Sequence, residues 1–229
     1  MKPLEDFVKV LSMLNIFSCV YIIHFYGASF IPNKICMITE YAPYGSLNDL
    51  MKKREENPID KRIRIKILID SAKGIKYLHI NGILHRDIKP DNILITSLDK
   101  NVEVNGKLTD FGSSRNINML MTNMTFTKGV GTPVYMAPEI LDRQKYKKTP
   151  DIYSFSITMY ECLSWRECYP KTLFPKPWDI ANFVSKGKRV EKSENMTEEE
   201  YLIINNSWKQ EAKERINIEN IIKELEKLC

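Results

Sequence analysis

The chain has 229 residues, of which 43% are hydrophobic and 28% charged, so it can bury a core as one domain or two small lobes and is not a disordered tail. Its formal charge of +5 comes from 34 basic and 29 acidic residues spread along the sequence, without the clustering that a nucleic-acid-binding surface requires. Five scattered cysteines with no C-x-x-C pair argue against a disulfide framework and a zinc site. We therefore expect a cytoplasmic protein that does not bind nucleic acid.

The N-terminal part is predicted to contain a helix, a hairpin and a second, short helix. Apolar side chains at residues 7, 10, 11 and 14 form one stripe of the first helix. Two runs rich in β-branched and aromatic residues, at residues 21–26 and 35–39, flank a Pro32-Asn33 turn and predict the hairpin. Ser46 and Asp49 resemble a capping box at the start of the short helix.

Residues 14–31 are apolar enough to suggest a membrane span of about 18 residues. Polar residues and a glycine interrupt this stretch, and the turn signal at residues 31–34 follows at once. We therefore expect part of a soluble core here and no membrane association.

The rest of the chain is predicted to contain three helices, two short strands and one long loop. The helices lie at residues 59–79, 151–163 and 217–228, the strands at residues 92–96 and 106–109, and the loop at residues 112–132. A loop of this length inside a compact domain usually carries function.

Three short motifs follow one another in the second half of the chain. His85, Arg86 and Asp87 followed by Asn92 match the pattern H-R-D-x-x-x-x-N, residues 110–112 read D-F-G, and residues 137–139 read A-P-E. Their order and separation resemble the signature set of the protein kinase superfamily, and the resemblance covers essentially the whole chain.

The chain is most similar to the tyrosine-kinase-like group of serine/threonine kinases. Residues 25–28, 45–47 and 151–155 carry this similarity, and Lys89 and Thr132 are typical of serine/threonine kinases. The resemblance implies transfer of the ATP γ-phosphate to Ser or Thr hydroxyls of a protein substrate.

The fold implied by the resemblance is α+β and bilobal, with a mostly helical large lobe and a small lobe truncated to one helix and a β-hairpin. We expect one kinase domain over residues 1–229, with the small-lobe remnant at residues 1–42 and the large lobe at residues 43–229.

Phosphoryl transfer depends mainly on positioning and on neutralising negative charge, which explains the residue types in these motifs. By the resemblance, Asp87 would align the nucleophile and accept its proton, and Lys89 would lie against the γ-phosphate. Asn92 and Asp110 would supply oxygen ligands to Mg²⁺, which prefers hard oxygen donors. ATP and Mg²⁺ are therefore the expected cofactors.

The resemblance also locates the nucleoside. Thr39 would be the gatekeeper, and the backbone of Glu40 and Ala42 would bind the adenine. Asp49 would contact the ribose, although an acidic residue at this position is equally typical of a helix N-terminus.

Supporting roles follow by the same resemblance. Glu139 and Arg215 would tie the activation segment, which includes Thr132 and ends at the A-P-E motif, to the large lobe, and His85 and Phe111 would pack beside the site. Arg86 would face a phosphorylated activation loop, with the candidate phosphorylation sites Thr125 and Thr127.

Part of the family pattern is missing from the sequence. We find neither the glycine-rich loop nor the strand lysine, and Val10 occupies the position of the glutamate that would pair with that lysine. We therefore expect an N-terminally incomplete domain that is poorly soluble or needs a partner to cover its small lobe. Two functions stay open, a serine/threonine kinase and a catalytically impaired pseudokinase that acts as a binding or scaffold protein.

Overall fold

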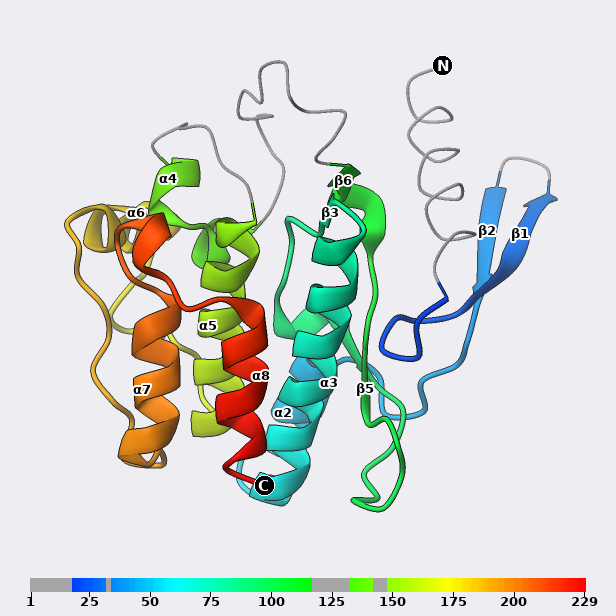
Figure 1. Ribbon diagram of the computed structural model, residues 1–229, viewed down its shortest axis with the longest axis horizontal. Helices are drawn as coiled ribbons and strands as arrows, with labels where there is room; N and C mark the ends of the chain where they lie inside the picture. The colour runs from blue at the N-terminus through cyan, green and yellow to red at the C-terminus, as the bar shows by residue number, and fades with distance from the viewer. Residues whose placement is uncertain (1–17, 32–33, 117–131, 142–147) are drawn as a thin grey trace.

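The computed structural model describes residues 18–31, 34–116, 132–141 and 148–229. In this part of the chain a body built mostly of helices carries a two-stranded antiparallel sheet at one side (Figure 1). This arrangement confirms the expected α+β fold with a helical large lobe and a hairpin in the smaller part.

Four helices of the body run side by side, since α3 contacts α5 and α8, and α7 contacts both α5 and α8 (Figure 1). The α-helices are α2 (Leu47–Lys53), α3 (Lys61–Ile80), α4 (Pro138–Leu141), α5 (Thr149–Ser164), α6 (Pro177–Ser185), α7 (Glu198–Ser207) and α8 (Ile218–Glu226).

Within the described ranges the strands form three small antiparallel sheets. They pair as β1 (Phe25–Ile31) with β2 (Lys34–Thr39), β3 (Ile83–Leu84) with β6 (Arg115–Asn116), and β4 (Ile93–Ile95) with β5 (Gly106–Leu108). Short 3₁₀ turns complete the body at η1 (Pro90–Asn92), η2 (Phe111–Ser113), η4 (Pro133–Tyr135) and η5 (Ala212–Glu214).

Helix starts follow local capping chemistry. Ser46 accepts a hydrogen bond from the Asp49 N–H, and the Asp49 carboxylate accepts one from the Ser46 N–H, which confirms the predicted capping box of α2. Asp60 and Asn217 cap α3 and α8 by a single bond each, in which the side chain accepts a backbone N–H of the first turn. The three long helices predicted from periodicity are therefore confirmed, with ends shifted by one or two residues.

The first strand is the clearest error of the sequence prediction. It begins at Phe25 rather than at Tyr21, because the β-branched residues before it pair with β5 instead of β2. The Ile23 N–H donates to the Leu108 carbonyl and the Leu108 N–H donates to the Tyr21 carbonyl, each at 2.9 Å. Ile22 and Ile23 are buried there, so burial against the body decided the pairing.

Helices α4, α6 and α7 were not predicted. Two of them carry capping signals in the sequence, Thr197 with Glu200 before α7 and Pro177 at the first position of α6. Their apolar stripes are short, and hydrophobic periodicity alone did not reveal them.

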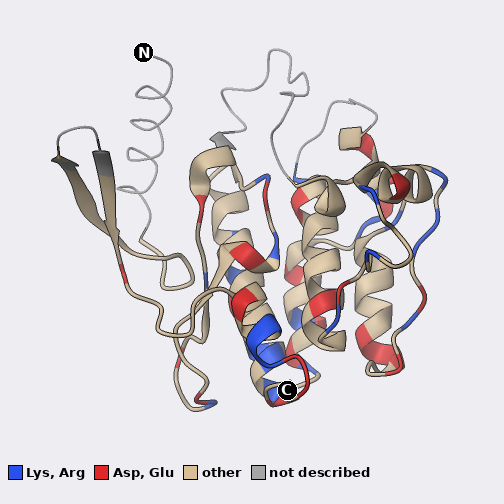
Figure 2. Cartoon of the chain, turned by 180° about the vertical axis from the view of Figure 1, so that it is seen from behind, with Lys and Arg blue, Asp and Glu red and all other residues tan. Residues whose placement is uncertain are grey.

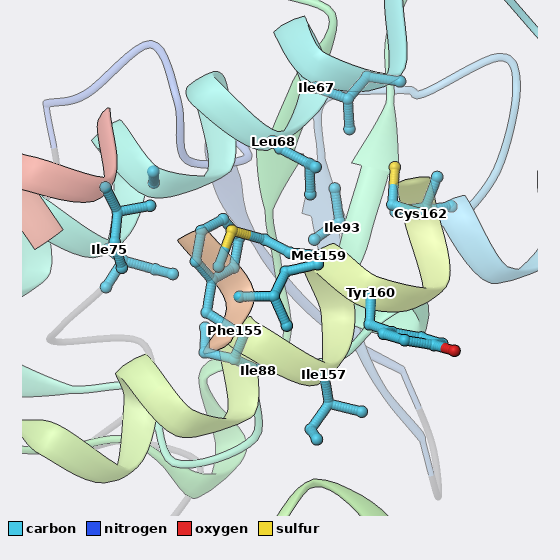
Figure 3. Packing of buried hydrophobic residues seen from close by; sticks show 14 of the residues in the cluster. Ile67, Leu68, Ile75, Ile88, Ile93, Phe155, Ile157, Met159, Tyr160 and Cys162 are labelled. Carbon is cyan, nitrogen blue, oxygen red and sulfur yellow. The ribbon is translucent and has the colours of Figure 1, made fainter. Parts of the chain in front are cut away.

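The core lies between α3 and α5 (Figure 3). Leu68 and Ile75 of α3 pack near Phe155 and Met159 of α5, and all four are completely buried. Ile67 of α3, also completely buried, lies against Gly106 of β5. Burying one such side chain contributes about 1.5–3 kcal/mol, so this contact between the two helices is a substantial part of the stability of the body.

The same core reaches the H-R-D loop. Ile88 and Ile93 are fully buried in it (Figure 3). These isoleucines alternate with the polar residues Asp87, Lys89 and Asn92, so their burial anchors the backbone that carries the predicted site.

Charged residues of both signs are interspersed over the helices and loops (Figure 2). Local runs occur at helix ends, with Lys52 and Lys53 in the last turn of α2 and three glutamates, residues 198–200, in the first turn of α7. Both runs have the sign that complements the helix dipole.

Some predictions concern residues outside the described part. These are the first helix with Val10, the Pro32-Asn33 turn, most of the long loop, and the candidate phosphorylation sites Thr125 and Thr127. Among the helices of the described ranges, none combines the length and the apolar character of a membrane span.

Candidate active site

The H-R-D loop is fastened to α5 by one buried carboxylate. Asp151 accepts the backbone N–H groups of His85 and Arg86 at 3.0 Å and 2.9 Å, and its Oδ2 lies 2.9 Å from His79 Nε2. Burial raises the pKa of Asp151, but His79 and the Arg86 N–H outweigh that effect and hold the pKa below its ordinary value. The carboxylate is therefore ionised and fixes the loop.

Arg86 itself has a left-handed backbone, with φ at 71°. A residue with a Cβ reaches this conformation at a penalty of about 1–3 kcal/mol. The hydrogen bond from its N–H to Asp151 helps to offset that penalty, so the direction of the chain at Asp87 is set by α5.

Four side chains meet at the predicted catalytic position. Lys89 Nζ lies 2.8 Å from Asp87 Oδ2 and donates to Thr132 Oγ1 at 2.8 Å, and Thr132 Oγ1 donates to Asp87 Oδ1 at 3.1 Å. The Asn92 side-chain amide donates to the Asp87 carbonyl at 2.7 Å and to Asp87 Oδ2 at 3.0 Å. The structure therefore brings together three of the predicted residues and adds Thr132, and we name these four residues the Asp87 cluster.

Asp87 is held in its ionised form. Partial burial raises its pKa, but Lys89, Asn92 and Thr132 together bring the pKa of Asp87 below its ordinary value. Its side chain keeps 11% exposure, and that of Lys89 keeps 18%. Both side chains are thus mostly buried and retain a small exposed fraction.

Asp110 lies beside this cluster through the backbone. The Thr109 N–H donates to the Asn92 carbonyl at 3.0 Å. Asp110 is therefore bonded covalently to the residue that pairs with Asn92. Asp110 is exposed, adopts a left-handed backbone at φ 59°, and accepts the Gly112 N–H at 3.2 Å.

The donor set fits a hard divalent cation. The Asn92 amide nitrogen is engaged by Asp87, so the side-chain oxygen is the atom of Asn92 suited to a metal. Together with the exposed Asp110 carboxylate it offers the oxygen donors that Mg²⁺ prefers. The residues present therefore fit Mg²⁺.

The predicted hinge residues lie between β2 and α2. The Glu40 carboxylate pairs with Lys107 Nζ at 2.6 Å and 2.8 Å, and the Ala42 carbonyl accepts the Gly45 N–H at 3.1 Å. Asp49 accepts the Ser46 N–H at 3.2 Å and the Ser46 hydroxyl at 2.8 Å, which lowers its pKa. The helix-capping alternative for Asp49 is therefore realised, and its ribose contact stays a prediction.

The ion pair predicted between Glu139 and Arg215 is confirmed. Arg215 donates to both Glu139 carboxylate oxygens, at 2.6 Å and 2.7 Å, and its side chain is completely buried. It joins α4 to the segment before α8 and so fixes the chain that follows Thr132.

His85 and Phe111 pack beside the site as the resemblance implied. Their ring centroids are 5.3 Å apart, and His85 Nε2 lies 2.9 Å from the Thr109 carbonyl. Burial lowers the pKa of His85, so the ring is neutral and serves packing rather than proton transfer.

Sequence reasoning missed two site residues and the partner of a third. Thr132 and Asp151 served only as markers of group similarity, and Lys107 was read only as part of a strand. A signal existed for Asp151, because an acidic residue at the start of an almost wholly apolar helix must find buried partners. For Lys107 the sequence holds no such signal.

The chain is similar to known proteins over nearly its whole length. The family described as protein tyrosine and serine/threonine kinase matches residues 1–225. The chain is 33% identical over 215 residues to the "Probable serine/threonine-protein kinase gdt9" of Dictyostelium discoideum, covering 82% of this chain and 13% of that protein. It is 31% identical over 225 residues to the RGS domain-containing serine/threonine-protein kinase A of the same organism, covering 98% of this chain and 19% of that protein. The chain thus spans less than a fifth of the length of either relative.

Proposed function

We propose, from the premise that this chain belongs to the protein tyrosine and serine/threonine kinase family, that it transfers the γ-phosphate of ATP to Ser or Thr hydroxyls of a protein. The observation that carries the proposal is the Asp87 cluster, where an ionised carboxylate, a lysine and a hydroxyl are joined by contacts of 2.8–3.1 Å.

The residues of the cluster divide the work of in-line transfer. Asp87 orients the substrate hydroxyl and takes up its proton, and the Asn92 amide keeps that carboxylate in place. Lys89, which contacts both Asp87 and Thr132, places a positive charge where negative charge develops on the phosphoryl oxygens. Thr132 links the activation segment to the cluster, so the site is complete only when that segment is in place.

Asn92 and Asp110 would hold Mg²⁺ through their side-chain oxygens. When bound, this ion neutralises charge on the phosphate oxygens. The hydrogen bond from the Thr109 N–H to the Asn92 carbonyl keeps Asp110 close to Asn92 in the backbone.

The nucleoside is proposed to bind between the two parts of the domain. In this proposal residues 1–42 contribute to the small lobe and residues 43–229 form the large lobe, with the hinge backbone of Glu40 and Ala42 facing the adenine. Asp49 is proposed to contact the ribose while it caps α2. The position of these residues between β2 and α2 supports this assignment.

We further propose a protein substrate, a cytoplasmic location, and a second protein that covers the hairpin. Exposed apolar side chains on β1 and β2 support the covering partner, since Tyr26, Met37 and Ile38 are each at least 50% exposed. A sizing experiment on the isolated chain tests it, because a stable monomer at high concentration would count against the partner.

Phosphotransfer from radiolabelled ATP to Ser/Thr peptides tests the proposed activity. We expect Asp87→Asn to lower the rate at least about a hundredfold, the usual contribution of a positioned base. Asp99→Asn is the matched control, because Asp99 lies in an exposed turn after β4 and should leave the rate unchanged. Equal signals from wild type and Asp87→Asn would end the enzymatic proposal and favour the binding or scaffold role.

A further inference from the structure

The hinge at residues 40–44 is held at both ends by one sheet of the body. Lys107 of β5 binds the Glu40 carboxylate at one end, with distances of 2.6 Å and 2.8 Å. At the other end the Tyr44 N–H donates to the Ile95 carbonyl of β4 at 3.3 Å. Because β4 and β5 pair directly, the hinge backbone spans two anchors on a single rigid support.

Glu40 is fixed from its other side by the backbone of His24. The Glu40 N–H donates to the His24 carbonyl at 2.8 Å, and the His24 N–H donates to Glu40 Oε2 at 3.2 Å. One carboxylate thus joins the ammonium of Lys107 to the chain entering β1. The side chains of Lys107 and Glu40 are 14% and 24% exposed, so solvent screens this pair less than a surface pair.

Lys107 is also close in sequence to a predicted metal ligand, Asp110. Lys107 lies on β5, three positions before Asp110. Thr109, the first residue after β5, donates its N–H to the Asn92 carbonyl. The strand that places the phosphate end of the site therefore also carries the anchor of the adenine end.

We propose that Lys107 is a positioning residue for nucleotide recognition, which fixes the backbone of Glu40 and Ala42 against adenine through its ion pair with Glu40. This inference rests on the proposed function. Selection of adenine over guanine depends on where the hinge N–H and C=O groups lie, and a hinge released from β5 loses that placement.

Titration calorimetry of the 229-residue chain with ATP and with GTP tests the inference. We expect Lys107→Met to weaken ATP binding about tenfold, or about 1.4 kcal/mol, with little change for GTP, so that the preference for ATP falls. Lys107→Arg keeps the charge and should retain most of the preference. The control is Lys61→Met, which breaks a 2.9 Å pair with Glu200 at the start of α3 and should change stability without changing the preference.

A double variant separates action through Glu40 from a general loss of stability. If Lys107 acts through Glu40, then Glu40→Gln with Lys107→Met should be no worse for ATP than either single change. Two outcomes would overturn this inference alone, provided that the wild type binds ATP. One is that the losses of the two single variants add in the double variant. The other is that the ratio of the GTP to the ATP dissociation constant in Lys107→Met equals that of the wild type. A wild type that binds neither nucleotide would overturn the proposed function together with it.

Discussion

Removing Arg215 should be among the most destabilising single changes in this protein. The guanidinium is completely buried and donates to both Glu139 oxygens at 2.6 Å and 2.7 Å. It also donates to the carbonyls of Thr149 and Lys209, each at 3.0 Å. A weaker bond of 3.4 Å joins it to the Gln210 carbonyl. Arg215→Ala therefore leaves a carboxylate and three carbonyls without this donor in a place that water reaches poorly.

The magnitude follows from the uncompensated charge. Breaking a buried ion pair by removing one partner costs about 3–5 kcal/mol, against a total stability of about 5–15 kcal/mol for a typical domain. Arg166→Ala is the control, because its 3.2 Å pair with Glu194 has side chains 64% and 74% exposed. Such an exposed pair contributes about 0–1 kcal/mol.

Urea unfolding followed by tryptophan fluorescence measures both variants, since the chain has three tryptophans. We expect Arg215→Ala to lower the free energy of unfolding by about 3–5 kcal/mol at an unchanged m-value. If that variant does not fold, Arg215→Lys and the double change Arg215→Met with Glu139→Leu take its place, and the double change should be the more stable of the two. An Arg215→Ala variant no less stable than Arg166→Ala would refute the reasoning.

Three further changes have defined outcomes. Burial raises the pKa of the Glu161 carboxyl from its ordinary 4.5 to about 7, so the folded state holds this proton more tightly than the unfolded chain does. The free energy of unfolding should therefore fall by up to about 3 kcal/mol as the pH rises from 5 through 7. Glu161→Gln removes that titration, and urea unfolding at pH 5 and pH 8 should show a flatter dependence. Gly74→Ala places a Cβ 2.9 Å from Leu108 Cδ1 and 3.0 Å from the Tyr21 carbonyl, so thermal unfolding should reveal a loss of about 1–3 kcal/mol. Thr132→Val removes a hydroxyl that bonds two members of the Asp87 cluster, so steady-state phosphotransfer should show kcat reduced about tenfold to a hundredfold with a similar KM for ATP.

Each of these expectations can fail in a distinct way. Parallel pH profiles for wild type and Glu161→Gln would mean that another group governs the titration. An unchanged melting temperature in Gly74→Ala would show that β5 can move away from α3. A Thr132→Val variant with full kcat would mean that the contact of the activation segment with the Asp87 cluster does not contribute to catalysis.

Local sequence determined the elements whose partners are near in the chain. The capping box of Ser46 and Asp49 and the long stripes of α3, α5 and α8 depend on contacts within a few residues, and these elements stand where periodicity and capping place them. The H-R-D-x-x-x-x-N pattern belongs to the same class, because Asn92 reaches Asp87 across five positions. The resemblance could therefore assign roles to both before any fold was known.

Tertiary structure decided what joins distant segments. Residues 21–23 have the composition of a hairpin strand, yet their burial on β5 outweighs pairing with β2. Thr132 reaches Asp87 across 45 positions and Lys107 reaches Glu40 across 67, and no pattern within either segment specifies its partner. The sequence by itself thus determined, through the resemblance, which residues are predicted to carry the chemistry of the site. Only the packing of α5, β5 and the segment around Thr132 decided which side chains hold them in place, since such contacts depend on the global arrangement of the chain.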